Sequence, residues 1–485
     1  MVRKLIMRLA FTTTVCMQAA TGATTQTGIA ETVGLAGVNV VDLESGDVRR
    51  NQTIVISAAT GRIVEIATGA RTKLAPTRTV DATGRFVIPG LWDMHVHTLQ
   101  RQLEPYLSSF IANGVTGVRD MGTEVSNLRL ADTWRRETRE GKRIAPRIYA
   151  SGPALGTPRP ERALPVGSPD EARAAVLTLK SEGANFVKVY SLLSRPAFLA
   201  VIDEAKKQQL DVVGHVPVSV TAQEASDAGQ KSMEHSYGIL ESCSTMEGEV
   251  RKEVEAAAAN PDTLAAWGAV VRATDRLYGT QARAQTYSRE KCQALFARFV
   301  RNATWRCPTL VLRRAFALRD DIAFTNDPRM KALPPSVIEA WRNPQADPRN
   351  RDLSADELRD RRLRLAKESD VTGEMHRAGV GILAGTDLGN PYVYPGPSLH
   401  DELALLVRAG LSTLDALRTA TLNPARFLGL SGTFGTVAEE KVADLVLLDG
   451  NPLDDITNTQ RIYGVVANGR YLARAELDSL QSRGR

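Results

Sequence analysis

Short apolar runs alternate with helical stretches along most of this chain, and this alternation constrains the fold more than any other feature. Amphipathic stretches such as SPDEARAAVLTLKSEGA separate most of the runs. Eight runs are strand candidates, because each is short, apolar and bounded by turn residues: FVIPGLWDMHVH, GVTGVRDMG, PRIYASG, NFVKVY, DVVGHVP, KSMEHS, TWRCPTLV and GILAGTD. Repeated strand–helix units of this number predict an α/β fold whose parallel strands close into a (β/α)8 TIM barrel.

Both ends of the chain have strand-like texture without intervening helices. Near the start lie GLAGVNVVDL, QTIVISAATGRIVEIA and RTVDATGRFVIPG, in which Val, Ile and Thr alternate between turn residues. Near the end lie ADLVLLDGNPLDDI and IYGVVANGRYL. This pattern favours short strands, so we expect the two chain ends to pair into one small lobe beside the barrel.

Long stretches separate the last three strand candidates. Residues 242–303 precede the seventh candidate, and a stretch of comparable length precedes the eighth; both are rich in Ala, Arg and Glu. We expect them to be helical and to shape a substrate pocket, since extensions at the carboxyl ends of barrel strands often do so. The segment ALPPSVIEAWRNPQADPRNRD is rich in proline and polar residues and is predicted to be a surface loop.

Only six histidines occur in the chain, and four of them fall in the strand candidates. His95 and His97 are two residues apart on one strand, so their side chains point the same way and can bind one ion. His215 and His235 fall in two later runs, and Asp387 ends the last one. Each residue alone is a weak signal. Together with a lysine in another run, they predict a two-metal hydrolytic site.

That lysine is Lys188, in NFVKVY. Phe186, Lys188 and Tyr190 share one face of this run, and a barrel strand directs one face to the interior. A buried ammonium group without a partner is costly, and neighbouring dications would raise the cost. Reaction of Lys188 with CO2 to a carbamate removes the positive charge and supplies two oxygens that can bridge two metals.

These motifs, in this order, resemble those of the amidohydrolase superfamily of metal-dependent hydrolases, over about residues 30 to 475. Within the superfamily the chain is most similar to the imidazolonepropionase-related and Xaa-Pro dipeptidase-like (prolidase) branch. The matching motifs are DMHVH, RDMG, Lys188, GHVP, MEHS, AGTD, LNPA and the tail motif ADLVLLDGNPLDDI.

The resemblance implies a TIM barrel over residues 89–430 and a composite β-sandwich built from residues 24–88 and 431–485. It also implies two divalent metal ions, with zinc as the expected metal. His95, His97 and Asp387 would hold the more buried ion, and His215 and His235 the more exposed one. Carboxylated Lys188 and a hydroxide would bridge the two, and Asp387 would carry the proton in catalysis.

The expected reaction is hydrolysis of an amide bond in a dipeptide or an N-acyl amino acid by the metal-bridging hydroxide. Tyr190 and Tyr237 are candidates for binding a substrate carboxylate or the oxyanion, although plain packing at the barrel mouth explains them equally well. Relatives often carry a Gly-Gly-His stretch after the third strand, whose histidine polarises the scissile carbonyl. The corresponding ASGPALGTPRPERALP has no histidine, which leaves open what assists the metal there.

Three other functions remain in view. A lactonase or organophosphate hydrolase would use the same dinuclear site. A mononuclear deaminase or imidazolone hydrolase is disfavoured by Lys188, because one metal needs no bridge. A non-catalytic scaffold is disfavoured because every ligand position is filled. His400 and His376 lie in helical stretches outside the ligand set; His400 is expected to be structural or to support a ligand, and His376 to lie on a helix face.

The first 23 residues resemble a secretory signal, with a basic start, an apolar stretch and small residues at the cut site. They predict a periplasmic or secreted protein; an unstructured start on a cytoplasmic protein is the alternative. Arg3, Lys4 and Arg8 account for three of the net +6 charges. Partner expectations are a small-molecule substrate, no nucleic acid, no membrane span and a homo-oligomer as an open possibility. In an oxidising compartment Cys243 and Cys292 could form a disulfide; unpaired buried thiols are equally compatible with the sequence.

Overall fold

Parallel strands form where the sequence predicts them in the computed structural model, which describes residues 31–99, 104, 106–158, 163–278, 284–343, 345 and 347–482. One three-stranded sheet has the order β6-β7-β8, and one four-stranded sheet has the order β12-β11-β10-β9. All their pairings are parallel. The strands are β6 (Leu91–Val96), β7 (Val115–Asp120), β8 (Arg147–Ala150), β9 (Val187–Val189), β10 (Val212–Gly214), β11 (Ser232–Glu234) and β12 (Trp305–Cys307).

The eighth predicted run, residues 381–387, together with the next residue, Leu388, joins both sheets through isolated parallel bridges. Ile382 pairs with Arg306 of β12, and Leu388 pairs with Val96 of β6. On the other side, Leu155 pairs with Val189 of β9. These bridges connect the two sheets into one curled α/β arrangement. The approach at the eighth run is close, because a Cβ atom at Gly385 would lie 2.5 Å from the sulfur of Cys307.

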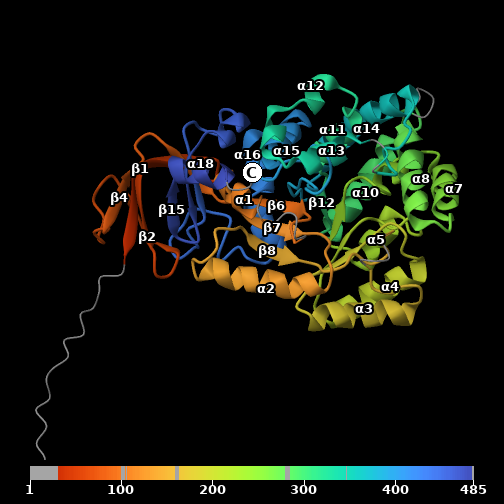
Figure 1. Ribbon diagram of the computed structural model, residues 1–485, viewed down its shortest axis with the longest axis horizontal. Helices are drawn as coiled ribbons and strands as arrows, with labels where there is room; N and C mark the ends of the chain where they lie inside the picture. The colour runs from red at the N-terminus through yellow and green to blue at the C-terminus, as the bar shows by residue number, and fades with distance from the viewer. Residues whose placement is uncertain are drawn as a thin grey trace, which may run out of the picture. The chain divides into compact units, whose positions relative to one another are not determined.

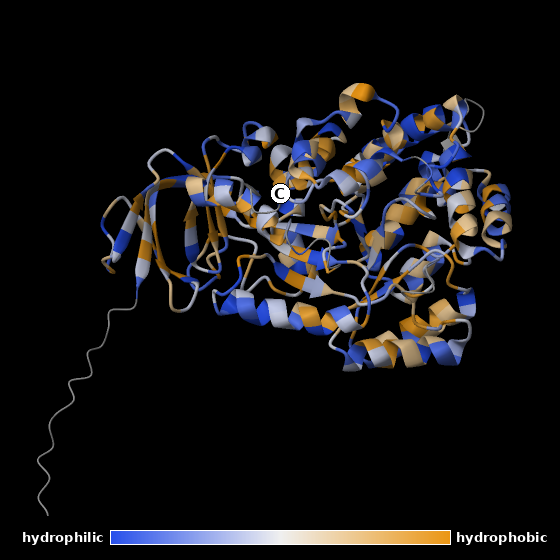
Figure 2. Ribbon diagram, viewed as in Figure 1, coloured by the Kyte–Doolittle hydropathy of each residue, from blue (hydrophilic) through white to orange (hydrophobic). Residues whose placement is uncertain are grey.

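Helices follow most of the strands and bury one apolar side. Helix α3 shows how the sequence builds them: Ser168 and Glu171 form a capping box at its start, and its buried residues follow the helical repeat. Figure 2 shows hydrophilic and hydrophobic residues alternating along such helices. The helices are α1 (Leu107–Ala112), α2 (Ser126–Arg139), α3 (Pro169–Ser181), α4 (Arg195–Lys207), α5 (Ala222–Ala228), α15 (Pro397–Arg408), α16 (Thr413–Thr419) and α17 (Leu422–Phe427).

The long stretches after β11 and β12 are helical, as the sequence predicts. The first contains α6 (Ile239–Ser242), α7 (Glu247–Ala258), α8 (Thr263–Asp275), η3 (Arg276–Tyr278) and α10 (Arg289–Arg301). A disulfide between Cys243 and Cys292 joins the end of α6 to α10, which answers the question that the sequence left open. The second contains α11 (Leu310–Ala317), α12 (Ile322–Thr325), η4 (Pro328–Ala332), α13 (Pro335–Arg342) and α14 (Ala355–Arg377).

The prediction of a surface loop over residues 332–352 is correct in part: most of the described residues there are at least partly exposed, but residues 335–342 form a helix. The segment contains α13, and its later part turns inward, where the side chain of Asn350 is buried. Asn350 is held there because its Oδ1 accepts a hydrogen bond from Arg361 of α14 at 2.8 Å. Part of the polar composition that suggests a loop therefore serves internal hydrogen bonds.

Strands from both chain ends form one eight-stranded sheet, and they lie side by side in Figure 1. Its order is β15-β14-β13-β5-β1-β2-β3, with β4 paired to β1. The two ends meet where β13 pairs antiparallel with β5. The strands are β1 (Thr32–Val41), β2 (Val48–Ser57), β3 (Arg62–Thr68), β4 (Arg78–Asp81), β5 (Phe86–Pro89), β13 (Leu445–Leu448), β14 (Ile462–Ala467) and β15 (Arg470–Ala473).

This terminal sheet has a hydrophobic core of its own, which includes Leu35, Ile54, Ile56, Leu445 and Leu447. Two further elements, η6 (Ile456–Gln460) and α18 (Arg474–Ser482), flank β14 and β15 in the sequence. The predicted signal peptide lies outside the described residues. Within the described part of the chain, we find no helix that combines the length and apolar character needed to span a membrane.

Candidate metal centre

The six predicted ligands meet at the carboxyl ends of the parallel strands. Asp387 lies at the middle of this group, and Nζ of Lys188 lies 3.4 Å from Nε2 of His95. The distances from imidazole Nε2 atoms to the Asp387 carboxylate are 3.1 Å for His97, 3.4 Å for His95 and 3.6 Å for His235. The ring of His215 lies 4.9 Å from that of His235, centroid to centroid. Strands far apart in the sequence thus bring these residues into one cluster.

Each of the four imidazoles is oriented by a contact at its Nδ1 atom. The Nδ1 partners are Glu234 Oε2 at 2.8 Å for His95, the Gly122 carbonyl at 3.2 Å for His97, Ser191 Oγ at 2.7 Å for His215 and Thr309 Oγ1 at 2.7 Å for His235. Such contacts fix the ring and leave Nε2 for a metal. The donor set therefore fits divalent metals: imidazole nitrogens, one carboxylate and one lysine converge, and imidazole with carboxylate suits zinc.

Burial governs the titration of this cluster. Burial lowers the pKa of Lys188 to about 8, and it lowers the pKa of His95 to about 4, with Lys188 adding to the effect. The pKa values of His215 and His235 are also lowered by burial. Burial alone would raise the pKa of Asp387, but the neighbouring imidazoles hold it well below its usual range. Neutral histidines and an ionised Asp387 are the forms that bind metals.

Glu234 and Arg119 belong to this site, although the sequence did not single them out as functional. Nη2 of Arg119 donates to Oε1 of Glu234 at 2.8 Å, and the hydroxyl of Ser232 donates to the same oxygen at 2.6 Å. The other Glu234 oxygen contacts His95. Burial alone would raise the pKa of Glu234, but Arg119 and His95 lower it by more than burial raises it. The pKa is therefore below its usual range, and the carboxylate is ionised. Each of the two is a charged residue within an apolar strand run, and this pattern, which pointed to Lys188, could have pointed to them as well.

A second group, His95, Glu234 and Cys307, also has its potential ligand atoms close together. It is a poor metal site, because both Glu234 oxygens already accept hydrogen bonds and burial raises the pKa of the Cys307 thiol. Glu234 is better explained as the group that orients His95.

Two of the ligands adopt left-handed backbone conformations. His235 and Asp387 each have φ of 58°, and Thr309, which contacts His235, has φ of 50°. Residues other than glycine rarely adopt this region, and each such residue costs about 1–3 kcal/mol. All three lie just beyond strand ends, where the backbone turns and directs the side chain to the cluster.

A cavity of about 390 Å³ opens onto the predicted metal ligands. The inserted segments supply part of its wall, with Leu264 and Trp267 from α8 and residues 347–349 from the segment before α14. This confirms that the long stretches shape a pocket. Pro153, Ala154, Thr157 and Pro158, from the segment after β8, line it as well.

The two predicted substrate-binding tyrosines lie on either side of this wall. Tyr190 lines the cavity, and its ring stacks on His215 at 4.0 Å. Tyr237 stacks on His215 at 5.1 Å but is buried; the described residues around the cavity do not include it, and it lines a small neighbouring cavity of about 30 Å³. Substrate binding by either residue stays a prediction.

The remaining two histidines lie apart from the cluster, as expected. His400 is buried on α15, where Nε2 donates to the carbonyl of Asn113 and Nδ1 contacts Oγ1 of Thr459, each at 3.0 Å. Burial lowers its pKa to about 4. His376 lies on α14 with Nε2 3.3 Å from Asp415. Both contacts join helices to neighbouring elements, which is a structural role.

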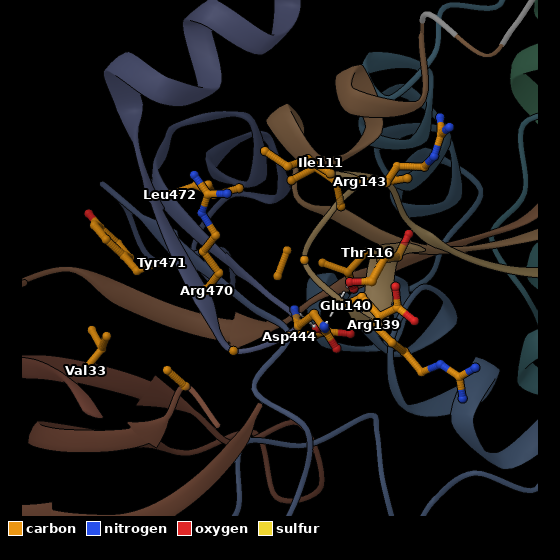
Figure 3. Close-up of a pocket in the computed structure, with 18 of the residues that line it drawn as sticks. Val33, Ile111, Thr116, Arg139, Glu140, Arg143, Asp444, Arg470, Tyr471 and Leu472 are labelled. Atoms are coloured by element: carbon orange, nitrogen blue, oxygen red, sulfur yellow. Dashed lines mark hydrogen bonds between the residues drawn. The ribbon is translucent and has the colours of Figure 1, made fainter. Parts of the chain in front are cut away.

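A larger cavity, of about 500 Å³, lies between the terminal sheet and the segment around α2 and β8 (Figure 3). None of the six predicted ligands is among the residues that line it. Several of its charged residues are already paired, including Arg147 with Asp444 at 2.8 Å and Arg470 with Glu476 at 3.2 Å. Size therefore does not locate the reaction in this protein, and the smaller cavity at the histidines is the candidate active site.

Comparison with known proteins agrees with this geometry. The model of the amidohydrolase family matches residues 86–472. No protein of curated function matches the chain. Among solved structures, a "putative prolidase" from Bifidobacterium longum is 25% identical, with a TM-score of 0.64, and the match covers 94% of this chain and 99% of that one.

Two further solved structures resemble the fold. A bottromycin amidohydrolase is 24% identical, with a TM-score of 0.68 and coverage of 93% of this chain and 88% of that one. A Xaa-Pro dipeptidase is 19% identical, with a TM-score of 0.63 and coverage of 91% and 100%. Prolidase-like structures are thus among the neighbours, as the motifs implied. The chain belongs to the amidohydrolase family and is a hydrolytic enzyme.

Proposed function

We propose that this enzyme is a dinuclear metal-dependent hydrolase that cleaves the amide bond of a dipeptide or an N-acyl amino acid. One observation carries the proposal: imidazole Nε2 atoms, the Asp387 carboxylate and Nζ of Lys188 converge at the end of one cavity. Its likeness to prolidases and to a bottromycin amidohydrolase supports an amide as the substrate bond.

In this proposal His95, His97 and Asp387 would hold one divalent ion, and His215 and His235 would hold the other. When bound, such ions lower the pKa of a coordinated water and polarise a carbonyl oxygen. Zinc is the metal that this donor set favours. The histidine rings are held ready for this role by their Nδ1 contacts, so little reorganisation accompanies metal binding.

Lys188 is proposed to react with CO2 to a carbamate, whose two oxygens would serve as ligands for the two ions. Its amine nitrogen forms a bond to the carbon of CO2 and releases one proton, which leaves an anion with two oxygens. The lowered pKa of about 8 favours this reaction, because a larger share of the amine is neutral near neutral pH than in an exposed lysine. The side chain is 1% exposed, and the carbamate would replace an isolated buried ammonium by a metal-paired anion.

Asp387 is proposed to move the proton. Its carboxylate is ionised and lies within 3.6 Å of three imidazole Nε2 atoms. A carboxylate oxygen at this position can accept the proton of the attacking water and deliver it to the nitrogen of the leaving amine. Ionisation of Asp387 is thus required twice, for ligation and for proton transfer.

The finer features of the fold and location are part of the same proposal. The bridges of residues 382 and 388 on one side and of residue 155 on the other support a closed (β/α)8 barrel. A composite β-sandwich is our proposal for the terminal sheet, and residues 1–23 are proposed to be a cleaved signal peptide. The Cys243–Cys292 disulfide supports export to an oxidising compartment such as the periplasm.

Metal analysis and a hydrolysis panel test the proposal. Purified enzyme should hold about two metals per chain and cleave dipeptides or N-acyl amino acids. Lys188→Ala should hold fewer than two metals and lose most of its activity, whereas Lys206→Ala, at an exposed lysine of α4, should match the wild type. One metal per chain with a fully active Lys188→Ala would refute the dinuclear site. Faster cleavage of lactones or phosphotriesters than of any amide would refute the substrate class.

A further inference from the structure

The wall of the active-site cavity contains a charged residue that the metal chemistry does not use. Apart from the predicted ligands, Arg349 is the one cationic residue among the described residues that line the cavity. An arginine stays protonated at any relevant pH. It lies in the segment before α14 that the sequence suggested to be a surface loop.

The guanidinium of Arg349 is held in place on three sides. Its Nε contacts both Asp347 oxygens at 3.0 Å, and its Nη2 lies 2.5 Å from Oδ2 of Asp347. Its Cζ lies 4.9 Å from the centroid of the Phe316 ring. Nη2 also donates to Oδ1 of Asn390 at 2.8 Å. A guanidinium fixed in this way loses little conformational entropy when it binds a ligand.

Asn390 also links this arginine to the metal centre. While its Oδ1 accepts from Arg349, its Nδ2 donates to the backbone carbonyl of Asp387 at 2.9 Å. A single side chain therefore sets the distance between the cation and the residue that is proposed to move the proton. This arrangement suits a substrate whose anionic group and scissile bond are a fixed, short distance apart.

One edge of the guanidinium remains available. Within the described part of the chain, Nη1 of Arg349 makes no hydrogen bond, while Nε and Nη2 are occupied by Asp347 and Asn390. The Arg349 side chain is 17% exposed. Asp347 offsets much of the cost of burying the guanidinium charge and fixes the orientation of the group. The two N–H groups of Nη1 therefore remain as donors for an anion.

We propose that Arg349 binds the free carboxylate of the substrate through Nη1. This inference rests on the proposed function and narrows its substrate class to amides with a free carboxylate close to the scissile bond, such as the carboxyl-terminal residue of a dipeptide or of an N-acyl amino acid. Asn390 is then a positioning residue that fixes Arg349 relative to Asp387 through its two hydrogen bonds.

Matched substrates test the role of Arg349. For an N-acyl amino acid, Arg349→Met should lower kcat/KM by about 10- to 100-fold, mainly through KM, as expected for loss of a charge-assisted hydrogen bond. For the same compound with its carboxylate converted to a carboxamide, kcat/KM should change by less than about threefold. Arg351→Met removes an exposed arginine of the same segment and should leave both substrates unaffected.

Additional measurements separate the possible failures. Metal content and thermal unfolding establish whether each variant is folded. Arg349→Lys keeps the positive charge and can still pair with Asp347, so it replaces Arg349→Met in the experiment if that variant does not fold. It should raise KM for the N-acyl amino acid by less than Arg349→Met would, and it should not raise KM for the carboxamide. Equal losses for acid and carboxamide, or no loss for either, would overturn the inference. If the wild type cleaves no amide at all, the proposed function fails instead.

Discussion

The candidate metal centre and the inserted segments that line its cavity are held together in different ways. At the centre, every histidine ligand has a short contact at Nδ1, and the contacts come from neighbouring strands or from the segments that follow them. Behind the wall, arginines 313, 361 and 364 pair with Asp275 and Glu368 in a buried network. Several of its described polar atoms make no hydrogen bond: Nη2 of Arg364 is one, and Oε2 of Glu368, which has only its ion pair with Arg313, is another.

This difference suggests that the strand ends serve the reaction and that the inserted segments serve substrate recognition. Ligands that are fixed by neighbouring strands keep their geometry, because a strand end cannot move without breaking its sheet. The wall depends on long side chains and on ion pairs that are not fully satisfied, and such networks contribute less to stability than their number suggests. We therefore expect changes in the wall to alter which substrate binds, and changes at the strand ends to alter whether metal binds.

The largest effect is expected from removing the covalent constraint on the first insert. Cys243 and Cys292 are 49 residues apart, and a disulfide that closes a loop of this size contributes about 2–4 kcal/mol to the free energy of unfolding. The double variant Cys243→Ala, Cys292→Ala should unfold at lower denaturant concentration while it still binds metal at the strand ends. Reductant should destabilise the wild type and leave the double variant unchanged; loss of metal binding in the folded double variant would break the comparison.

An intermediate effect is expected when the orientation of one ligand is removed. Glu234→Gln keeps the shape of the side chain but loses the charge that pairs with Arg119 and orients His95. Loss of such an orienting group typically lowers metal affinity by about 10- to 100-fold. Competition with a chelator would measure this, and Glu204→Gln on α4 serves as the control. Unchanged metal affinity in Glu234→Gln would show that His95 needs no orientation.

The smallest effect is expected from His400, a buried histidine outside the candidate metal centre, through the pH dependence of stability. His400 is buried and its pKa is lowered to about 4 in the folded protein, against about 6.5 in the unfolded chain. The unfolded state therefore binds more protons between these values, and stability is lost as the pH falls below about 6.5. From pH 7 to pH 5.5 this amounts to about 1 kcal/mol.

His400→Gln should flatten this part of the pH dependence without changing metal content. Denaturant titrations at a series of pH values in metal-free enzyme would measure it. An identical pH slope in the variant would mean that His400 does not titrate as its burial implies.

Much of the strand order and all six candidate ligands could be predicted from the sequence, because both depend on local patterns. A short apolar run ends in a turn, and the polar residue at that turn points to the common end of the strands; Asp387 and His235 are examples. The positions of Trp267 and Arg349 could not be predicted. They depend on how inserted helices fold back over the cavity, and a polar, proline-rich segment has the same composition on a surface or on a wall.

The left-handed residues His235, Asp387 and Thr309 have a consequence for engineering. Glycine would relieve this backbone strain, but at His235 and Asp387 it would remove a side chain of the cluster, and at Thr309 the hydroxyl that contacts His235. A directed-evolution experiment that selects for heat resistance alone can therefore relieve strain at these positions only by discarding side chains of the proposed active site. Selection for thermostability in this scaffold should keep turnover in the screen, and the terminal sheet is the safer place to seek improvement.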